Sequence, residues 1–142
     1  ELLIVLIIIG ILAGALLLVA GAGTDKANAT KIVSNLRSAK AAALMVYADH
    51  NGSWSWTIGD TSRDFVKYMD KGTETDKLSI ETGDNGIFIK YSGTGVVTTG
   101  VKDKLSDLAE SGVPIYDNDA VESDDPPSYA TPSDVYMSLF FD

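Results

Sequence analysis

The 142-residue chain has no cysteine and only one histidine, His50. The lack of cysteine excludes disulfides, thiolate metal sites and covalent c-type haem. One histidine cannot build a metal cluster of several histidines within one chain, and we interpret His50 as a solvated residue at a helix end. The sequence also lacks a phosphate-binding loop, a nucleophile elbow and a zinc signature. We therefore expect no enzyme, no catalytic residue, no metal site and no cofactor.

Charge is absent from a long segment at the N-terminus. Glu1 is followed by no charged residue until Asp25, and Leu2 to Ala20 consists only of Leu, Ile, Val, Ala and Gly. About 20 apolar residues cross a hydrocarbon layer about 30 Å thick, so this segment is a candidate membrane span. A secretory signal peptide would need a basic region before the apolar stretch, and no basic residue precedes Leu2. Such a segment must find lipid or other protein chains.

Proline is absent before Pro114, so nothing in the first part of the chain forces a helix to break. We expect one helix of about 50 residues, near 75 Å long, ended by the left-handed stop signal Asn51-Gly52. We divide the chain into two regions. Residues 1–23 form the apolar half of the helix, and residues 24–142 contain its amphipathic half and the globular head. Glycines 10, 14, 21 and 23 weaken the join between the halves. One face of the second half is apolar at helical spacing: Ala29, Ile32, Val33, Leu36, Ala39, Ala43, Val46 and Tyr47. The other face carries Lys31, Ser34, Asn35, Arg37, Ser38 and Lys40.

The remainder predicts a small α+β head. A short helix is expected over 61–68, with Thr61 and Asp64 in capping-box positions. The alternating runs around Gly83 to Gly86, within 77–92, predict a hairpin. A helix is expected over 101–110, with Val101, Leu105, Leu108 and Ala109 on one face, and a final strand over 134–142. The segment 116–134 is rich in acids, Pro and Ser, so we expect a loop there.

Basic residues are absent from the last quarter of the chain. Residues 105–142 hold nine acids and no base, whereas the acids and bases of residues 1–104 cancel. Nucleic-acid binding by the acidic surface is disfavoured, because affinity for phosphate backbones comes chiefly from Lys and Arg. The acidic loop within 116–134 is either solvated or a calcium site. It lacks the Asp-x-Asp-x-Asp-Gly motif of an EF-hand loop. The acids concerned are Asp117, Asp119, Glu122, Asp124 and Asp125.

Trp54 and Trp56 follow the long predicted helix. Exposed indoles could form a carbohydrate-binding platform, whereas buried ones would supply much of a small core. We favour packing of the head against the helix.

The N-terminus resembles the type IV pilin and type II secretion pseudopilin family. Two motifs carry the resemblance, Glu1-Leu2-Leu3-Ile4-Val5 and Ile9-Gly10-Ile11-Leu12-Ala13, and it is sharp over about the first 25 residues. It implies a pilin-like α+β fold, in which the long helix packs on a small antiparallel sheet. In that family the acidic residue lies a few positions after the leader cleavage point, and a proline is common near the position of Leu18. Here Glu1 comes first, so we expect a few residues to precede it in the mature protein, the alternative being a different mature end, and the proline is absent.

The resemblance implies a structural subunit that polymerises through its N-terminal helix into a type IV pilus-like filament, with roles such as adhesion or motility. It further implies cleavage by a prepilin peptidase, N-terminal methylation, an inner-membrane stage and an assembly machinery as partner. The filament itself, a homo-oligomer, would be extracellular or in the cell envelope. A secretion pseudopilin and a single-pass anchor for a binding domain are the alternatives.

We expect assembly to depend on the first fourteen residues. In a staggered bundle the Glu1 carboxylate would mark one axial register, paired in the resembling family with a neighbour's N-terminal amine. A carboxylate that complements the helix macrodipole is the simpler alternative. The expected assembly residues are Glu1, Leu2, Leu3, Ile4, Val5, Leu6, Ile7, Ile8, Ile9, Gly10, Ile11, Leu12, Ala13 and Gly14.

Overall fold

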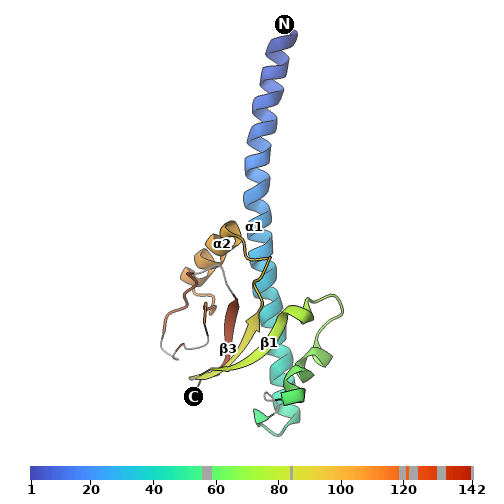
Figure 1. Ribbon diagram of the computed structural model, residues 1–142, viewed down its shortest axis with the longest axis vertical. Helices are drawn as coiled ribbons and strands as arrows, with labels where there is room; N and C mark the ends of the chain where they lie inside the picture. The colour runs from blue at the N-terminus through green and yellow to red at the C-terminus, as the bar shows by residue number, and fades with distance from the viewer. Residues whose placement is uncertain (56–58, 84, 119–120, 122–124, 131–133, 142) are drawn as a thin grey trace.

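Helix α1 (Leu2–Asp49) begins the chain, and its second half carries the head (Figure 1). The computed structural model describes residues 1–142 except 56–58, 84, 119–120, 122–124, 131–133 and 142. The side chains of residues 18, 20, 22, 59–62 and 141 are likewise outside the description. The described side chains of α1 therefore fall mainly into two stretches, 1–17 and 23–49. The predicted α+β class, with an N-terminal helix and a small antiparallel sheet, is confirmed.

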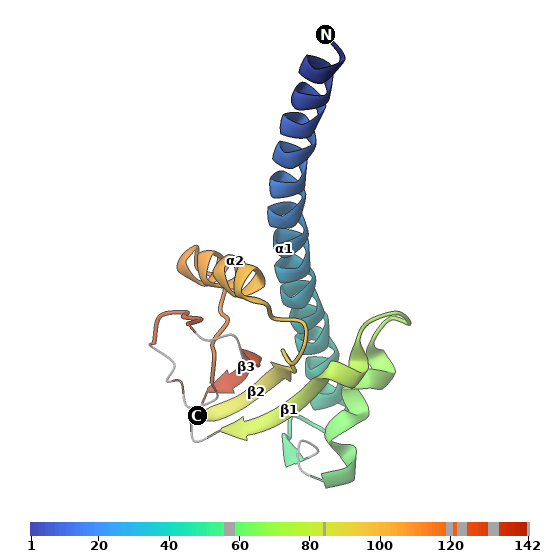
Figure 2. The ribbon, with the colours of Figure 1, turned by 45° about the horizontal axis from the view of Figure 1, so that its top comes forward.

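The head contains a three-stranded antiparallel sheet in the order β1 (Leu78–Gly83), β2 (Gly86–Tyr91) and β3 (Val135–Phe141). The predicted hairpin is confirmed, since Leu78 pairs with Tyr91 and Gly83 with Gly86. The predicted final strand is β3, which pairs with the central strand β2. Figure 2 shows the sheet beside the second half of α1, with α2 above the sheet on the same side of the helix.

The buried stripe of α1 forms one side of the core. It contains Ala29, Ile32, Val33, Leu36, Ala39, Ala43 and Val46, all expected from the apolar spacing, together with Ala42. Tyr47, the last expected member, is half-buried. Opposite the stripe, Ile89 and Tyr91 of β2 and Val135 and Met137 of β3 complete the cluster. Alanines in this stripe leave room for the sheet to lie close to the helix.

The polar face of α1 is exposed except at two positions that find partners in the head. Asn35 lies near Glu74, and the Lys40 ammonium donates a hydrogen bond of 2.7 Å to the Ser138 carbonyl oxygen. Burial lowers the pKa of Lys40, because the charged form loses hydration. A backbone acceptor on β3 therefore turns a residue of the predicted outer face toward the sheet.

Helix α1 ends at the predicted stop signal. Asn51 and Gly52 adopt positive φ angles of 56° and 74°, and the Gly52 N–H donates to the Tyr47 carbonyl oxygen at 2.9 Å. The reversed chain brings Trp54 onto Tyr47, with ring centroids 4.4 Å apart, and near Phe140 at 6.3 Å. Trp54 thus packs against the helix, as favoured above, whereas Trp56 lies outside the described residues.

The two shorter predicted helices have different outcomes. The helix expected over 101–110 is confirmed as α2 (Thr99–Glu110), capped by the Thr98 hydroxyl, which accepts from the Val101 N–H. Val101, Leu105 and Ala109 of its predicted face are buried, and Leu108 is half-buried.

The segment expected to be a helix over 61–68 is instead part of a 3₁₀ helix, η2 (Gly59–Tyr68). Its first half holds Gly, Asp, Thr and Ser, which gain little from α-helical propagation, and the tighter turn still delivers Phe65 to the core. The capping role expected of Thr61 lies outside the described side chains.

The polar segment 116–134 is partly packed into the head. Tyr116, Val121 and Tyr129 are buried, and Tyr116 exchanges two backbone hydrogen bonds of 2.9 Å with Tyr136. Tyr116 and Val121 cover Phe88, which is buried on the face of β2 that points away from α1. The loop expected to be solvated therefore closes the second face of the sheet through its few apolar residues.

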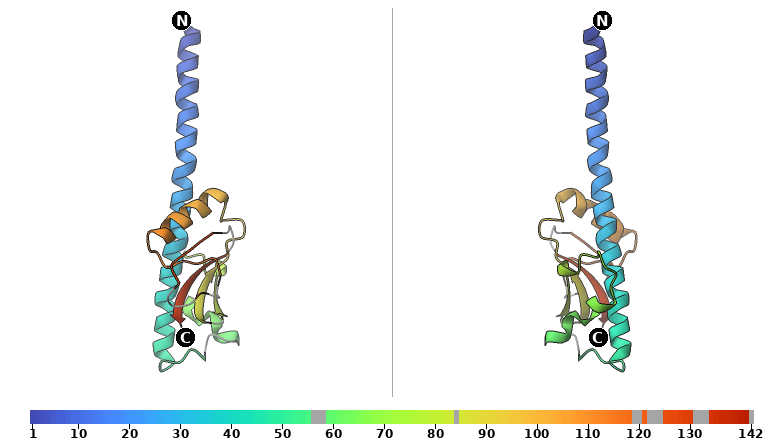
Figure 3. Two further views of the ribbon diagram at one scale, coloured as in Figure 1. Left: turned by 90° about the vertical axis from the view of Figure 1, so that its left-hand side faces the viewer. Right: turned by 90° about the vertical axis from the view of Figure 1, so that its right-hand side faces the viewer.

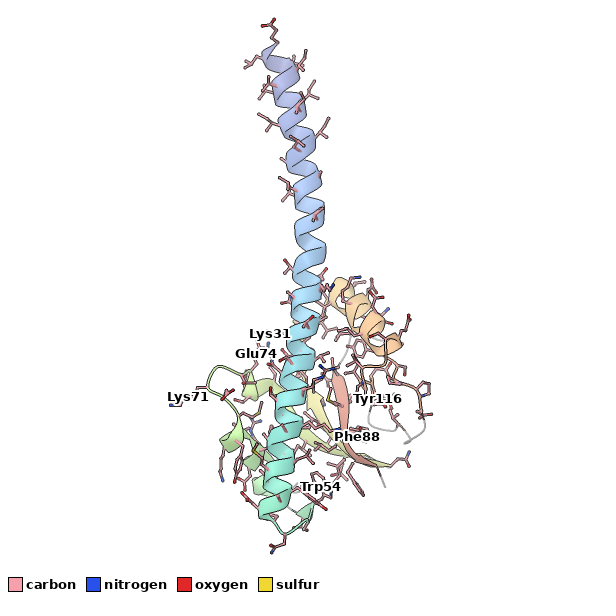
Figure 4. The ribbon with its side chains drawn as sticks, turned by 180° about the vertical axis from the view of Figure 1, so that it is seen from behind. Lys31, Trp54, Lys71, Glu74, Phe88 and Tyr116 are labelled. Carbon is pink, nitrogen blue, oxygen red and sulfur yellow. The ribbon has the colours of Figure 1, made fainter. Side chains whose placement is uncertain are left out.

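Glu74 ties α1 to the sheet. Its carboxylate lies 3.2 Å from the Lys31 ammonium (Figure 4) and accepts a 2.7 Å hydrogen bond from the Tyr91 hydroxyl. Lys77, at the end of η3 (Thr75–Lys77), lies 3.5 Å away. The hydrogen bond from Tyr91, with smaller contributions from the lysines, lowers the pKa of Glu74.

We predict that Leu36→Ala lowers the free energy of unfolding of the head by about 2–5 kcal/mol, because it empties a fully buried site. Leu44→Ala is the matched control: Leu44 lies on the same helix but is 43% exposed, so a change within about 0.5 kcal/mol is expected. Urea unfolding in mild detergent, followed by tryptophan fluorescence, measures both. Equal losses would contradict the assigned burial.

We predict that Glu74→Gln destabilises the head at pH 7 and that this difference shrinks in acid. Since the folded pKa lies below the ordinary value of 4.5, the folded state binds the Glu74 proton more weakly than the unfolded chain does. The stabilisation is therefore present above about pH 4.5 and lost as the pH falls through the folded pKa. Glu110→Gln, at an exposed carboxylate on α2, is the control. A constant difference between pH 7 and pH 3 would rule out this linkage.

Candidate functional site

The N-terminal part of α1 projects beyond the head, with no other described element beside it (Figures 1 and 3). We call residues 1–17 the stalk. Residues 1–14, the assembly residues expected from the sequence, are all exposed on it. The large aliphatic side chains between Leu2 and Leu17 are 51% to 77% exposed. The stalk is therefore apolar on every side, whereas the same helix from Ala29 onward is apolar on one side and covered there.

An apolar surface of this size needs a cover. Burying one Leu, Ile or Val side chain is worth about 1.5–3 kcal/mol, so covering the dozen on the stalk is worth on the order of 10 kcal/mol or more. Soluble monomers rarely expose apolar patches above a few hundred Å². The cover must come from outside the described head, either as lipid or as other protein chains.

Two glycines cut a notch into the stalk. Gly10 and Gly14 lie four residues apart, on one face of the helix, and an added Cβ at either would meet nothing within 4 Å. Small residues at this spacing let two helices approach closely. The Gly-x-x-x-Gly pattern is visible in the sequence and could have indicated a helix-packing face there.

Glu1 carries the only charge of the stalk. It occupies the N-cap position of α1, and its backbone carbonyl accepts from the Val5 N–H at 3.4 Å. Its exposed side chain makes no capping hydrogen bond. Local capping therefore leaves the carboxylate available to a cation outside its own helix.

The acidic loop gives no metal site among the residues that the structure describes. There, no three His, Cys, Asp or Glu side chains gather closely enough to hold one ion. Asp119, Glu122 and Asp124 of the predicted calcium alternative lie outside that part. Asp117 accepts hydrogen bonds from the Asn118 side chain and the Ala130 N–H, at 2.9 and 3.3 Å.

Within the described part of the chain, which leaves out three side chains inside α1, no helix is both long and apolar enough to cross a membrane.

Comparison with protein-family models, with curated proteins and with solved structures finds no match to this chain. The resemblance of the N-terminal motif to pilins stays a prediction, and function is inferred from the stalk and the head themselves.

We predict that deletion of residues 1–24 releases a soluble, folded, monomeric head. The deletion removes the all-round apolar surface and keeps Asp25 and every buried residue of α1. Deletion of residues 1–33 is the matched comparison, because it also removes Ala29, Ile32 and Val33 from the core and should unfold the head. Size-exclusion chromatography and circular dichroism decide. A stable oligomer, or an unfolded chain, from the shorter deletion would contradict the division of the chain into a stalk and an independently folded head.

Proposed function

We propose that this chain is the structural subunit of a type IV pilus-like filament, which polymerises through the stalk and carries the head on its outside. One observation supports the proposal above the others: residues 2–17 expose apolar side chains on every face, while the head has its own buried core on the second half of the same helix. The stalk lies outside the core of the head and is apolar on all sides, so its surface suits packing among many copies of the chain.

Packing of many stalks in a helical array would remove their apolar side chains from water. The notch at Gly10 and Gly14 allows close approach of two helices. The aliphatic side chains between the glycines would then supply the apolar contact area between neighbouring helices. The stalk holds no Phe, Tyr or Trp, so the filament core would consist of small and aliphatic side chains only.

Lipid is the natural cover before assembly. Leu2 to Ala20 has the length and composition that a span of about 30 Å requires, so the proposal includes residence in the inner membrane before extraction into the filament. The resemblance to pilins adds processing by a prepilin peptidase and an assembly machinery as partners. A secretion pseudopilin would use the same surfaces in a shorter fibre.

We predict that Glu1→Ala abolishes or disorders filaments and leaves the head folded. The mutation removes the only charge of the stalk, and with it the penalty that an unpaired buried carboxylate places on wrong registers. Glu110→Ala, which removes an exposed carboxylate from α2, is the matched control and should assemble normally. Electron microscopy of fibres from cells that produce each variant, with mass spectrometry to identify the subunit, gives the readout.

Normally ordered fibres from Glu1→Ala would contradict the register role. If the unaltered chain stays in the membrane as single subunits under conditions that produce other fibres, the chain is a single-pass anchor and the filament proposal fails.

A further inference from the structure

A groove runs beside α1 where α2 crosses it. Two hollows, of about 250 and 270 Å³, share Thr30 and Leu108 in their linings and so lie side by side in one depression of the surface. Its floor is apolar, made of Ala29, Val33, Leu108 and Val113. Its charged rim consists of Lys26, Arg37, Lys104 and Asp107. We call this depression the α1–α2 groove.

The groove is basic on a chain that is strongly acidic. Its rim has three bases and one acid, hence a net charge of +2, whereas the chain carries −9. Lys104 is paired with Asp107 at 2.8 Å. Over the described residues, Lys26 and Arg37 make no ion pair with any acid. Two cations at the rim are therefore open to an anionic group from outside.

Asp25, the acid that precedes Lys26 in the chain, contacts α2. The Asp25 carboxylate lies over Gly100 at the start of α2, with its Cγ 2.7 Å from the place that a Cβ on Gly100 would occupy. A carboxylate there complements the N-terminal end of the α2 dipole. Asp25 is thus engaged with α2, and Lys26 stays an exposed ammonium beside an apolar floor.

We infer that the α1–α2 groove receives the tip of the stalk of a second copy, with the Glu1 carboxylate paired to Lys26; this inference rests on the proposed function. The stalk tip has the matching chemistry, one carboxylate followed by exposed Leu and Ile side chains. The groove offers the complement, cations at the rim and apolar atoms on the floor.

The pairing sets an axial register. Lys26 is the first base along the chain, so parallel helices with Glu1 beside Lys26 are offset by 25 residues, or about 37 Å at 1.5 Å per residue. Arg37 lies eleven residues further along, about 16 Å away, too far to hold the same carboxylate. Lys26 therefore defines one offset, and Arg37 would define a different one.

Charge reversal tests the pair. Glu1→Lys and Lys26→Glu should each lower the filament yield by about tenfold or more, through like charges at the contact, and the double variant should recover most of the unaltered yield. Glu1→Lys combined with Arg37→Glu should not recover. Lys71→Glu is the matched control, because Lys71 is an exposed lysine outside the groove (Figure 4). Fibre counts by electron microscopy and the pelleted fraction give the yield.

A zero-length carbodiimide cross-link tests the contact in unaltered filaments. Mass spectrometry should identify a Glu1–Lys26 linked peptide between copies. Lys26→Arg should keep the filaments and lose the linked peptide, since it retains the charge but lacks a primary amine.

Recovery in the double variant together with the Glu1–Lys26 linked peptide supports the inference. If the unaltered chain forms filaments but either the recovery or the linked peptide is missing, the inference is overturned and the filament proposal stands. A link from Lys26 to the acidic segment 116–134 would assign the groove to a neighbouring head and also overturn it. Absence of any filament from the unaltered chain overturns both.

Discussion

The change of surface along α1 governs the arrangement of the whole chain. Up to residue 17 the described helix is apolar on every side and stands clear of the head, and from Ala29 it offers a single stripe. The sheet and α2 occupy that stripe, and no element that the structure describes covers the stalk. Because α1 carries both surfaces, the register of the stalks would set the positions of the heads in any bundle that the stalks form.

Polar contacts hold the head in one orientation on its stripe. Glu74 joins α1 to β2 through Lys31 and Tyr91, and Lys40 of α1 reaches a backbone oxygen of β3. Within the head, Lys90 of β2 lies 3.4 Å from Glu81 on β1 and 3.0 Å from Asp134, the residue just before β3. The contacts of Glu74 and Lys40 restrict how the sheet slides along α1, whereas the contacts of Lys90 hold the strands to one another.

Periodicity in the sequence predicts those elements whose structure depends mainly on residues close together in the chain. The stripe from Ala29, the stop at Asn51 and Gly52, the hairpin and α2 all follow from spacing and turn residues. The 3₁₀ form of η2 and the burial of Tyr116 in a polar loop do not, since both depend on distant core contacts. Among candidate sites, a uniformly apolar run marks the stalk, whereas the α1–α2 groove exists only once α2 crosses α1.

In the proposed filament the stalk is buried against other copies of itself while the heads stay outside. Electron cryo-microscopy of fibres purified from cells that produce this chain, with helical reconstruction, measures that arrangement directly. The expected map has a column of α-helices at the fibre axis, continuous with heads on the surface. A map with heads at the axis and stalks facing solvent would contradict this arrangement.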